Sequence, residues 1–174
     1  MPDYSHFTMA MAAANGQPEA VFDALCALTE EAVGVKLFTV MAFDGATGMA
    51  QRIYTNMPDA YPVSGTKPAN RTHWSIEVME KRRTFVANDI EGIRAVFYDH
   101  ELIQSLGCES VINVPVVVQG DVIGTINCLH EAGFYTDARV KAAETLKLPG
   151  AACLLLNERA ARKETTPEES TDGR

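Results

Sequence analysis

Two asparagines, Asn113 and Asn127, lie within runs rich in Val and Ile at 110–118 and 122–129. An amide among buried apolar side chains needs hydrogen-bond partners, since an unpaired buried polar group costs about 1–3 kcal/mol. Helix backbone, water and a bound ligand are the available partners. Recognition of a polar small molecule through hydrogen bonds is therefore one of three roles that these residue types allow.

Four further polar or aromatic side chains have both a functional and a structural interpretation. His73 and Trp74 begin a predicted helix and offer an aromatic floor for a planar ligand, or a packed Trp beside a hydrogen-bonded His. Tyr61 lies in a proline-rich loop, where its hydroxyl closes a pocket or lies on the surface. Asp89 contacts a polar ligand or only caps a helix.

Two adjacent aromatic residues, Phe97 and Tyr98, are equally compatible with the core and with a pocket wall. The strand face that carries the two asparagines also presents Val111 and Thr125 if the strands pair as described below. The predicted ligand-binding set is Tyr61, His73, Trp74, Asp89, Phe97, Tyr98, Val111, Asn113, Thr125 and Asn127.

Sequence signatures of catalysis and of metal binding are missing. The chain contains no G-x-S-x-G, no H-E-x-x-H and no phosphate-binding loop. Cys26, Cys108, Cys128 and Cys153 form no C-x-x-C and are predicted to be reduced thiols in the core. We expect no catalytic residue and no metal ion, and the sequence favours a protein that is not an enzyme.

The composition bounds the class of protein. A chain of 174 residues with 47% hydrophobic and 22% charged residues predicts one packed domain. A formal net charge of -8 argues against nucleic acid and anionic membrane as partners. Because no apolar run is long enough to span a bilayer and the N-terminus lacks a basic segment, we expect a cytoplasmic protein.

The first part of the chain predicts a helix and a hairpin. Apolar residues at helical spacing predict a helix from Pro18 to just before Gly34, with a stripe wide enough to cover a sheet face. Strands are predicted at 36–44 and 50–56, joined by a glycine-containing turn. The stretch 57–71 holds three prolines and predicts a surface loop, a kind of segment that commonly carries binding residues.

The middle of the chain predicts short elements. A helix is predicted over 72–83, followed by a short strand at 84–87. A broken helix follows over 90–106, with Asp89 and Asp99 as the predicted caps of its two parts.

The runs at 110–118 and 122–129 predict an antiparallel hairpin around Gln119-Gly120-Asp121. If Val118 lies opposite Val122 across a three-residue loop, one face is almost entirely apolar, and a shift of one residue would exchange the two faces. The other face then carries Val111, Asn113, Pro115, Thr125, Asn127 and Leu129.

The two ends of the chain differ in character. A final helix is predicted over 136–161, and Pro149-Gly150 should kink or interrupt it. Residues 163–174 are polar and acidic and predict a disordered tail. Residues 1–16 end in Asn15-Gly16 and are interpreted as an N-terminal extension.

Several stretches around the central hairpin resemble the signature of GAF domains, and the resemblance covers roughly residues 17 to 160. It places the domain at 17–162. The matching stretches are Thr84-Phe85-Val86-Ala87-Asn88-Asp89, Leu106-Gly107-Cys108-Glu109-Ser110, Asn113-Val114-Pro115-Val116 and Gly120-Asp121-Val122-Ile123-Gly124-Thr125-Ile126-Asn127.

The resemblance implies an α+β fold with a roughly six-stranded, mainly antiparallel sheet. The N- and C-terminal helices would cover one face of the sheet. The loop at 57–71 and the short helices at 72–106 would roof a pocket on the other face. That pocket would be lined by the face that carries Asn113, Thr125 and Asn127.

Two groups of GAF domains with known chemistry differ from this chain at the residues that matter. Free methionine-sulfoxide reductases use Cys in the middle loop and helices, and this chain has none between Cys26 and Cys108. Phytochrome-type domains place Cys directly before His in the last strand, whereas here Leu129 separates Cys128 from His130. A redox enzyme related to those reductases is therefore a disfavoured alternative, and no covalent bilin is expected.

We expect a stand-alone GAF domain that binds an unidentified small molecule and acts as a sensor and regulatory dimerisation module. The homodimer is expected to form through the terminal helices, where Leu154-Leu155-Leu156 supply an apolar stripe. An interaction scaffold whose pocket is closed by its own side chains is the other alternative.

Overall fold

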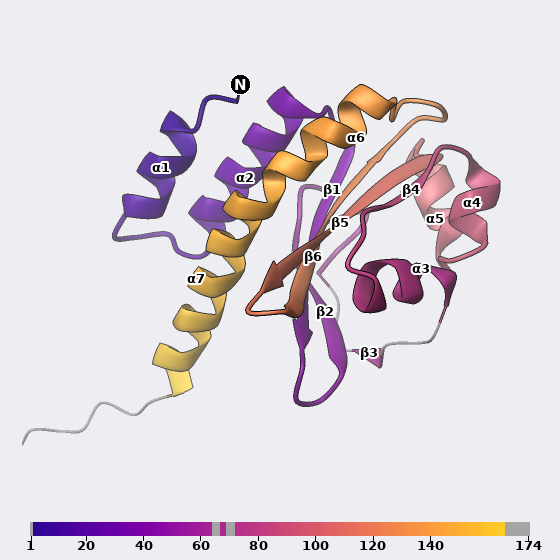
Figure 1. Ribbon diagram of the computed structural model, residues 1–174. Coiled ribbons are helices and arrows are strands. Elements are labelled where there is room, and N and C mark those ends of the chain that lie inside the picture. The colour runs from indigo at the N-terminus through magenta and orange to yellow at the C-terminus, as the bar shows by residue number, and fades with distance from the viewer. Residues whose placement is uncertain (1, 64–66, 69–71, 166–174) are drawn as a thin grey trace, which may run out of the picture.

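The computed structural model describes residues 2–63, 67–68 and 72–165, which form an antiparallel sheet between two layers of helices (Figure 1). The strand order is β3-β2-β1-β6-β5-β4, and β3, at one edge, is only two residues long. This confirms the predicted α+β fold with a mainly antiparallel sheet. The strands are β1 (Leu37–Asp44), β2 (Met49–Thr55), β3 (Lys67–Pro68), β4 (Phe85–Ala87), β5 (Ser110–Val118) and β6 (Asp121–His130).

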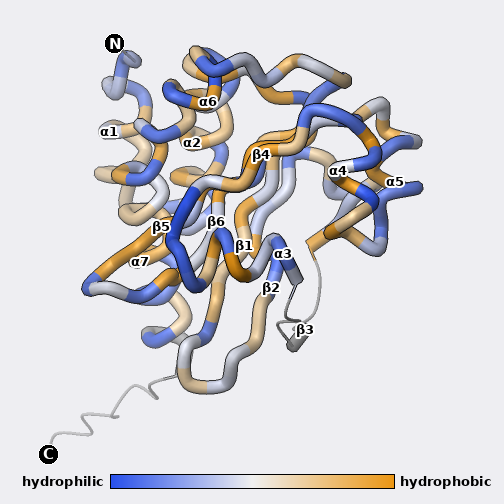
Figure 2. Tube along the Cα trace, turned by 45° about the vertical axis from the view of Figure 1, so that its right-hand side comes forward, coloured by the Kyte–Doolittle hydropathy of each residue, from blue (hydrophilic) through white to orange (hydrophobic). Residues whose placement is uncertain are grey.

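The helices divide between the two faces of the sheet. Helices α1, α2, α6 and α7 lie on one side of it, and α3, α4 and α5 lie on the other (Figures 1 and 2). The helical segments are α1 (Ser5–Ala12), α2 (Glu19–Ala32), α3 (His73–Ser75), the π-helix η1 (Ile76–Glu80), α4 (Ile90–Arg94), α5 (His100–Ser105), α6 (Asp137–Ala143), the 3-10 helix η2 (Glu144–Leu146) and α7 (Lys147–Thr165).

Helix α2 follows directly from its apolar spacing. Val21, Leu25 and Leu28 recur on one face of the helix, and all three are buried. The helix ends where Gly34 adopts a φ of 81°, in the left-handed region that glycine enters without steric cost. Helix α1, in the predicted N-terminal extension, packs on α2 and buries Phe7.

The C-terminal helix differs from its prediction in where it is interrupted. The interruption is the 3-10 turn η2, and α7 then continues through Pro149. Pro149 is the third residue of α7, in the first turn, where a backbone N–H has no partner within the helix and its loss costs little. Helix α7 extends to Thr165, into the predicted tail at 163–174, and 166–174 lie outside the described residues.

The central hairpin has the predicted faces but a different turn. Val118 pairs with Asp121 across a two-residue turn, in which Gln119 and Gly120 have φ values of 52° and 92°. The pairing shifts by one residue between Val116 and Val117, and this irregularity compensates for the shorter turn. Asn113 therefore still pairs with Asn127, and the apolar and polar faces are those expected from the sequence.

Each face of the sheet has its own apolar core. Below α2 and α7, Phe38, Val40, Ile112, Val114, Ile126 and Cys128 form the larger core. On the other face, Leu37, Val111 and Leu129 pack with Val78, Ile93 and Ile103 from the short helices. The second core surrounds the candidate site.

The four cysteines do not form disulfides. Cys108, Cys128 and Cys153 are buried and Cys26 is half-buried. Burial raises the pKa of Cys26 to about 11 and that of Cys153 to about 12. These thiols therefore stay protonated at neutral pH and are poor nucleophiles.

Candidate ligand-binding site

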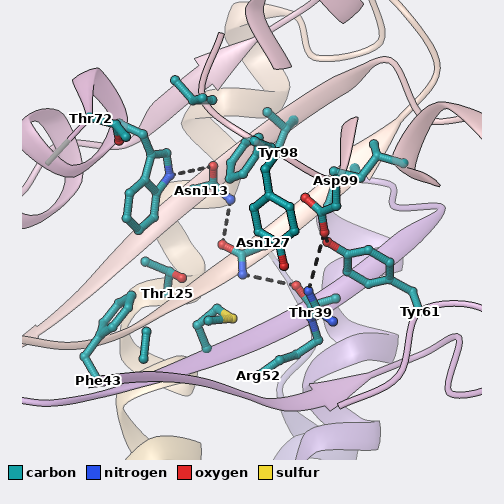
Figure 3. A pocket seen from close by; sticks show the side chains of 18 residues that line it. Thr39, Phe43, Arg52, Tyr61, Thr72, Tyr98, Asp99, Asn113, Thr125 and Asn127 are labelled. Atoms are coloured by element: carbon teal, nitrogen blue, oxygen red, sulfur yellow. Dashed lines mark hydrogen bonds and ion pairs between the residues drawn. The ribbon is translucent and has the colours of Figure 1, made fainter. Parts of the chain in front are cut away.

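A cavity of about 230 Å³ lies between the sheet and the short helices of the middle segment (Figure 3). Strands β1, β2, β5 and β6 form its floor, and its roof comes from the loop around Tyr61, from α3 and from the connection between α4 and α5. This is the face on which the sequence predicted a pocket. The polar lining residues are Thr39, Arg52, Tyr61, Thr72, Trp74, Tyr98, Asp99, Asn113, Thr125 and Asn127.

The floor of the cavity carries a continuous row of hydrogen-bonded side chains. Trp74 Nε1 donates to Asn113 Oδ1 at 3.0 Å, and Asn113 Nδ2 donates to Asn127 Oδ1 at 2.6 Å. Asn127 Nδ2 then donates to Thr39 Oγ1 at 3.1 Å. The row crosses three strands because Asn113, Asn127 and Thr39 are direct partners in the β5, β6 and β1 register (Figure 3).

The direction of this row follows from the chemistry of its first member. An indole N–H donates and cannot accept, so Asn113 must turn its carbonyl oxygen toward Trp74. Its NH₂ group then faces Asn127, which must present its own oxygen and leave its NH₂ for Thr39. The Thr39 hydroxyl accepts this bond and keeps its own proton.

Thr125 is the one side chain on this floor with a buried oxygen that lacks a partner within the described chain. The residue is fully buried, and its Oγ1 forms no hydrogen bond with the described residues. It lies two residues from Asn127 on β6, so both side chains face the cavity. A buried hydroxyl without a partner indicates a position that water or a ligand occupies.

A charged cluster closes one end of the cavity. The Tyr61 hydroxyl donates to Asp99 Oδ2 at 2.6 Å, and Arg52 Nη2 lies 4.0 Å from the same oxygen. The Arg52 guanidinium lies 3.8 Å from the centre of the Tyr61 ring and donates to the Pro62 carbonyl at 2.7 Å. The cluster therefore joins β2, the loop after it and the segment before α5 (Figure 3).

The charged cluster also changes the acidity of its tyrosine. Burial, and then the hydrogen bond to Asp99, raise the pKa of Tyr61 above its ordinary value. The hydroxyl thus stays a donor to the Asp99 carboxylate at neutral pH.

Aromatic side chains form the walls of the cavity. Trp74 is held at the start of α3, where Thr72 and Ser75 cap each other's backbone N–H groups. The rings of Phe43 and Phe97 each lie with their centres 6.4 Å from that of Trp74. The predicted helix over 72–83 is in fact this short turn followed by the π-helix η1, which ends at Glu80.

Two predicted site residues do not line the cavity. The His73 ring packs edge-on against Phe85, with centres 6.3 Å apart. Asp89 caps α4 by accepting from the Gly92 N–H at 2.8 Å, which was its structural alternative. The other eight, whose part in binding stays a prediction, surround the cavity: Tyr61, Trp74, Phe97, Tyr98, Val111, Asn113, Thr125 and Asn127.

Four polar lining residues were missed by the sequence analysis: Thr39, Arg52, Thr72 and Asp99. Asp99 was predicted to cap a helix, but its side chain makes no cap and faces Tyr61 instead. Arg52 is a cation on the cavity side of β2, and a cation within an alternating strand is a signal that could have identified it. Thr39 gave no such signal, because threonine is common in strands.

The described residues contain neither a metal cluster nor a membrane-spanning helix. Within them, no three His, Cys, Asp or Glu side chains gather closely enough to hold a metal ion. Over the same residues, no helix has the length and hydrophobicity that crossing a bilayer requires.

The chain is similar to solved GAF domains over most of its length. A GAF domain of a two-component sensor histidine kinase from Bacillus halodurans matches with a TM-score of 0.67 and 11% identity, over 83% of this chain and 98% of that one. The GAF domain of a phosphoenolpyruvate-protein phosphotransferase from Coxiella burnetii has a TM-score of 0.67 and 15% identity, over 92% and 93% of the two chains. At these identities the likeness shows the fold alone.

A comparison with curated proteins finds no significant match. The family model described as "GAF domain" matches residues 16–147, which is well over half of the sequence and includes every strand of the sheet. The chain therefore belongs to the GAF domain family.

Proposed function

We propose that this chain is a sensor or regulatory module that binds a small molecule in the cavity above the Asn113–Asn127 row. The observation that carries the proposal is the fully buried Thr125 hydroxyl, which faces the cavity without a partner in the described chain. A ligand or water there would supply the missing hydrogen bond.

The composition of the lining supports binding over a purely structural role. Ligand sites combine mostly apolar walls with a few polar groups that fix orientation, and this cavity pairs aromatic walls with one hydrogen-bonded floor. An interaction scaffold would be expected to fill this space with its own side chains. The open volume of about 230 Å³ favours the binding module.

The sensing role is supported by the proteins from which similar structures come. These include two-component sensor histidine kinases and a methyl-accepting chemotaxis protein, each with a domain of this fold. We propose an analogous regulatory role here. We further propose a cytoplasmic location. The acidic composition argues against binding to nucleic acid or anionic membranes.

A thiol-based redox enzyme remains the weaker alternative. None of the four cysteines lines the described cavity, and burial raises the pKa of the thiols. A reductase would need at least one of them beside its substrate.

Native mass spectrometry of the protein purified from its own host tests the binding proposal. We expect a retained small molecule that is lost from a Trp74→Ala variant, in which a cavity wall is removed. A Val117→Ala variant is the control, because Val117 is exposed on β5 and does not line the cavity. A spectrum of the bare chain alone, at several protein concentrations, would contradict the proposal.

We also propose that two copies associate through their terminal helices. The predicted stripe Leu154-Leu155-Leu156 is wrong in detail, because Leu154 is buried in the core and Leu156 packs against it. Leu148 and Leu155 are exposed by 79% and 45%, and they lie seven residues apart, on one side of α7. This pair of leucines would be the centre of a helix–helix contact.

Light scattering after size exclusion tests the dimer. We expect a mass of two chains for the protein and of one chain for Leu148→Glu/Leu155→Glu. Glu158→Lys is the control for a general charge effect on α7, since it is exposed on the same helix. A monomer at high concentration would remove this part of the proposal.

A further inference from the structure

The hydrogen-bond inventory of the cavity narrows the class of ligand, and this inference rests on the proposed binding function. Three properties of the lining carry it: its charge balance, its unused donors and acceptors, and its size.

The described part of the lining is electrically balanced before any ligand binds. Among the described lining residues only Arg52 and Asp99 carry a charge, and they lie 4.0 Å apart with exposed side-chain fractions of 13% and 17%. The guanidinium is further engaged by the Pro62 carbonyl and the Tyr61 ring, and the carboxylate by the Tyr61 hydroxyl. A charged ligand would have to break this cluster or remain unpaired in a partly buried site, which is unfavourable.

Two hydroxyl groups on the floor of the cavity, those of Thr39 and Thr125, can still form hydrogen bonds with a ligand. Thr39 accepts from Asn127, so its own proton is directed to a further acceptor, and the described chain supplies none. Thr125 Oγ1 has no partner within the described chain and can both accept and donate. Thr39 therefore needs an acceptor on the ligand, whereas Thr125 can accept from a ligand donor or donate to a second acceptor.

The spacing of the two threonines suits one compact group. Thr39 is the direct cross-strand partner of Asn127, and Thr125 lies two residues from Asn127 on the same strand. Diagonal neighbours of this kind are about 7–8 Å apart at Cα, and less at their side chains. A single amide, with its C=O toward Thr39 and its N–H toward Thr125, spans that gap with two hydrogen bonds of about 2.9 Å.

The walls and the volume define the rest of the molecule. The rings of Trp74, Phe43 and Phe97 present flat apolar surfaces around the cavity. A volume of about 230 Å³ equals that of roughly eight water molecules in the liquid. The cavity therefore fits a flat molecule of roughly eight to ten non-hydrogen atoms.

We propose that this cavity selects an uncharged, planar carboxamide or lactam, whose C=O accepts from Thr39 and whose N–H donates to Thr125. The ring of the ligand lies among the aromatic walls, and the Arg52–Asp99 pair stays intact at the end of the cavity. Charge and hydrogen-bond polarity, rather than size, then decide which molecules bind.

Three probes of equal size separate these properties: benzamide, benzoate and benzamidinium. All three are planar and of nearly the same shape. Benzamide presents a hydrogen-bond acceptor beside a donor, benzoate presents acceptors alone, and benzamidinium presents donors alone. The chain contains one tryptophan, so its indole N–H gives a single NMR signal, from a residue in the lining. Titrating the full-length protein and following that signal measures all three affinities.

We expect benzamide to bind in the millimolar range typical of so small a ligand, and at least ten-fold more tightly than either charged probe. Thr125→Val, which replaces the hydroxyl by a methyl of equal size, should weaken benzamide binding roughly three- to ten-fold. The same variant should unfold at an equal or higher temperature, because the buried hydroxyl without a partner is gone. Thr125→Ser keeps the hydroxyl and should restore the affinity for benzamide.

The outcomes separate this inference from the function on which it rests. Tighter binding of benzoate or benzamidinium would overturn the ligand class and leave small-molecule binding intact, as would unchanged benzamide affinity in Thr125→Val. If none of the probes moves the indole signal, the inference fails. The proposed function fails with it only when native mass spectrometry also finds no retained molecule.

Discussion

Asn113 on β5 and Asn127 on β6 face each other across the two strands and share a hydrogen bond of 2.6 Å from Nδ2 of the first to Oδ1 of the second. Both are almost fully buried, with 3% and 6% of their surface exposed. The hydrogen bond between the two amides therefore replaces one that bulk water cannot supply at this depth. The pair also links Trp74 in the roof to Thr39 in the floor. The row both stabilises the sheet and shapes the cavity.

Asn127→Leu should destabilise the protein by about 2–3 kcal/mol, because it leaves the Asn113 NH₂ group buried without an acceptor. Urea denaturation followed by circular dichroism measures this change in the free energy of unfolding. Gln51→Leu, at the exposed position of β2, is the control and should change stability by less than about 0.5 kcal/mol. Equal effects of the two variants would contradict the proposed role of the row.

The double variant Asn113→Leu/Asn127→Leu should be less destabilised than the sum of the two single variants, by about 1 kcal/mol or more. The physical reason is that removing both amides leaves no unpaired group between them. Additive effects in the same denaturation experiment would show that the two amides act independently.

Tyr61→Phe should destabilise the protein by about 1–3 kcal/mol, since it removes the hydroxyl that donates to the Asp99 carboxylate. The measurement is again chemical denaturation near neutral pH. Tyr4→Phe removes the same atom from a residue near the N-terminus whose hydroxyl makes no such bond to a carboxylate among the described residues, and it should leave stability nearly unchanged. If the free energy of unfolding of Tyr61→Phe equals that of the original protein, the charged cluster does not stabilise the roof of the cavity.

Stability should fall at alkaline pH because burial raises the pKa of Tyr54, Tyr61 and Tyr135 above the ordinary value of about 10. A group whose pKa is raised in the folded state binds its proton more tightly there than in the unfolded chain. Its contribution is complete below about pH 10 and is lost as pH rises through the folded-state pKa.

Ultraviolet titration of tyrosinate tests this. Three of the five tyrosines should ionise only together with the loss of circular dichroism, and Tyr61→Phe should reduce that number to two. Smooth ionisation of all five at their ordinary pKa, in a protein that stays folded, would be inconsistent with their burial.

Gly150→Ala should destabilise the protein by about 1–3 kcal/mol, although alanine is the better helix former by up to about 1 kcal/mol. A methyl group at this position in α7 would collide with the tip of the buried Ile126 side chain and crowd Val116, so these side chains would have to repack in a filled core. Gly45→Ala is the matched control, because a methyl there meets no atom within 4 Å. Thermal unfolding of the two variants measures the difference, and a stabilised Gly150→Ala would refute the close packing.

The sequence alone determined the features that depend on local pattern. The 3.6-residue spacing of Val21, Leu25 and Leu28 predicted α2, and alternation along β5 and β6 predicted which side chains share a face with Asn113. Burial of amides among Val and Ile also predicted that Asn113 and Asn127 would need partners, because that requirement holds in any fold.

Only the tertiary structure decided which partners those were. Arg52, Tyr61 and Asp99 are separated by up to 47 positions and meet because β2, its following loop and the start of α5 converge at one end of the cavity. Asp89 and Asp99 both precede short helices, yet one caps its helix and the other faces Tyr61. A helix cap satisfies local geometry alone, whereas a contact across the fold depends on how distant elements pack, which no short stretch of sequence encodes.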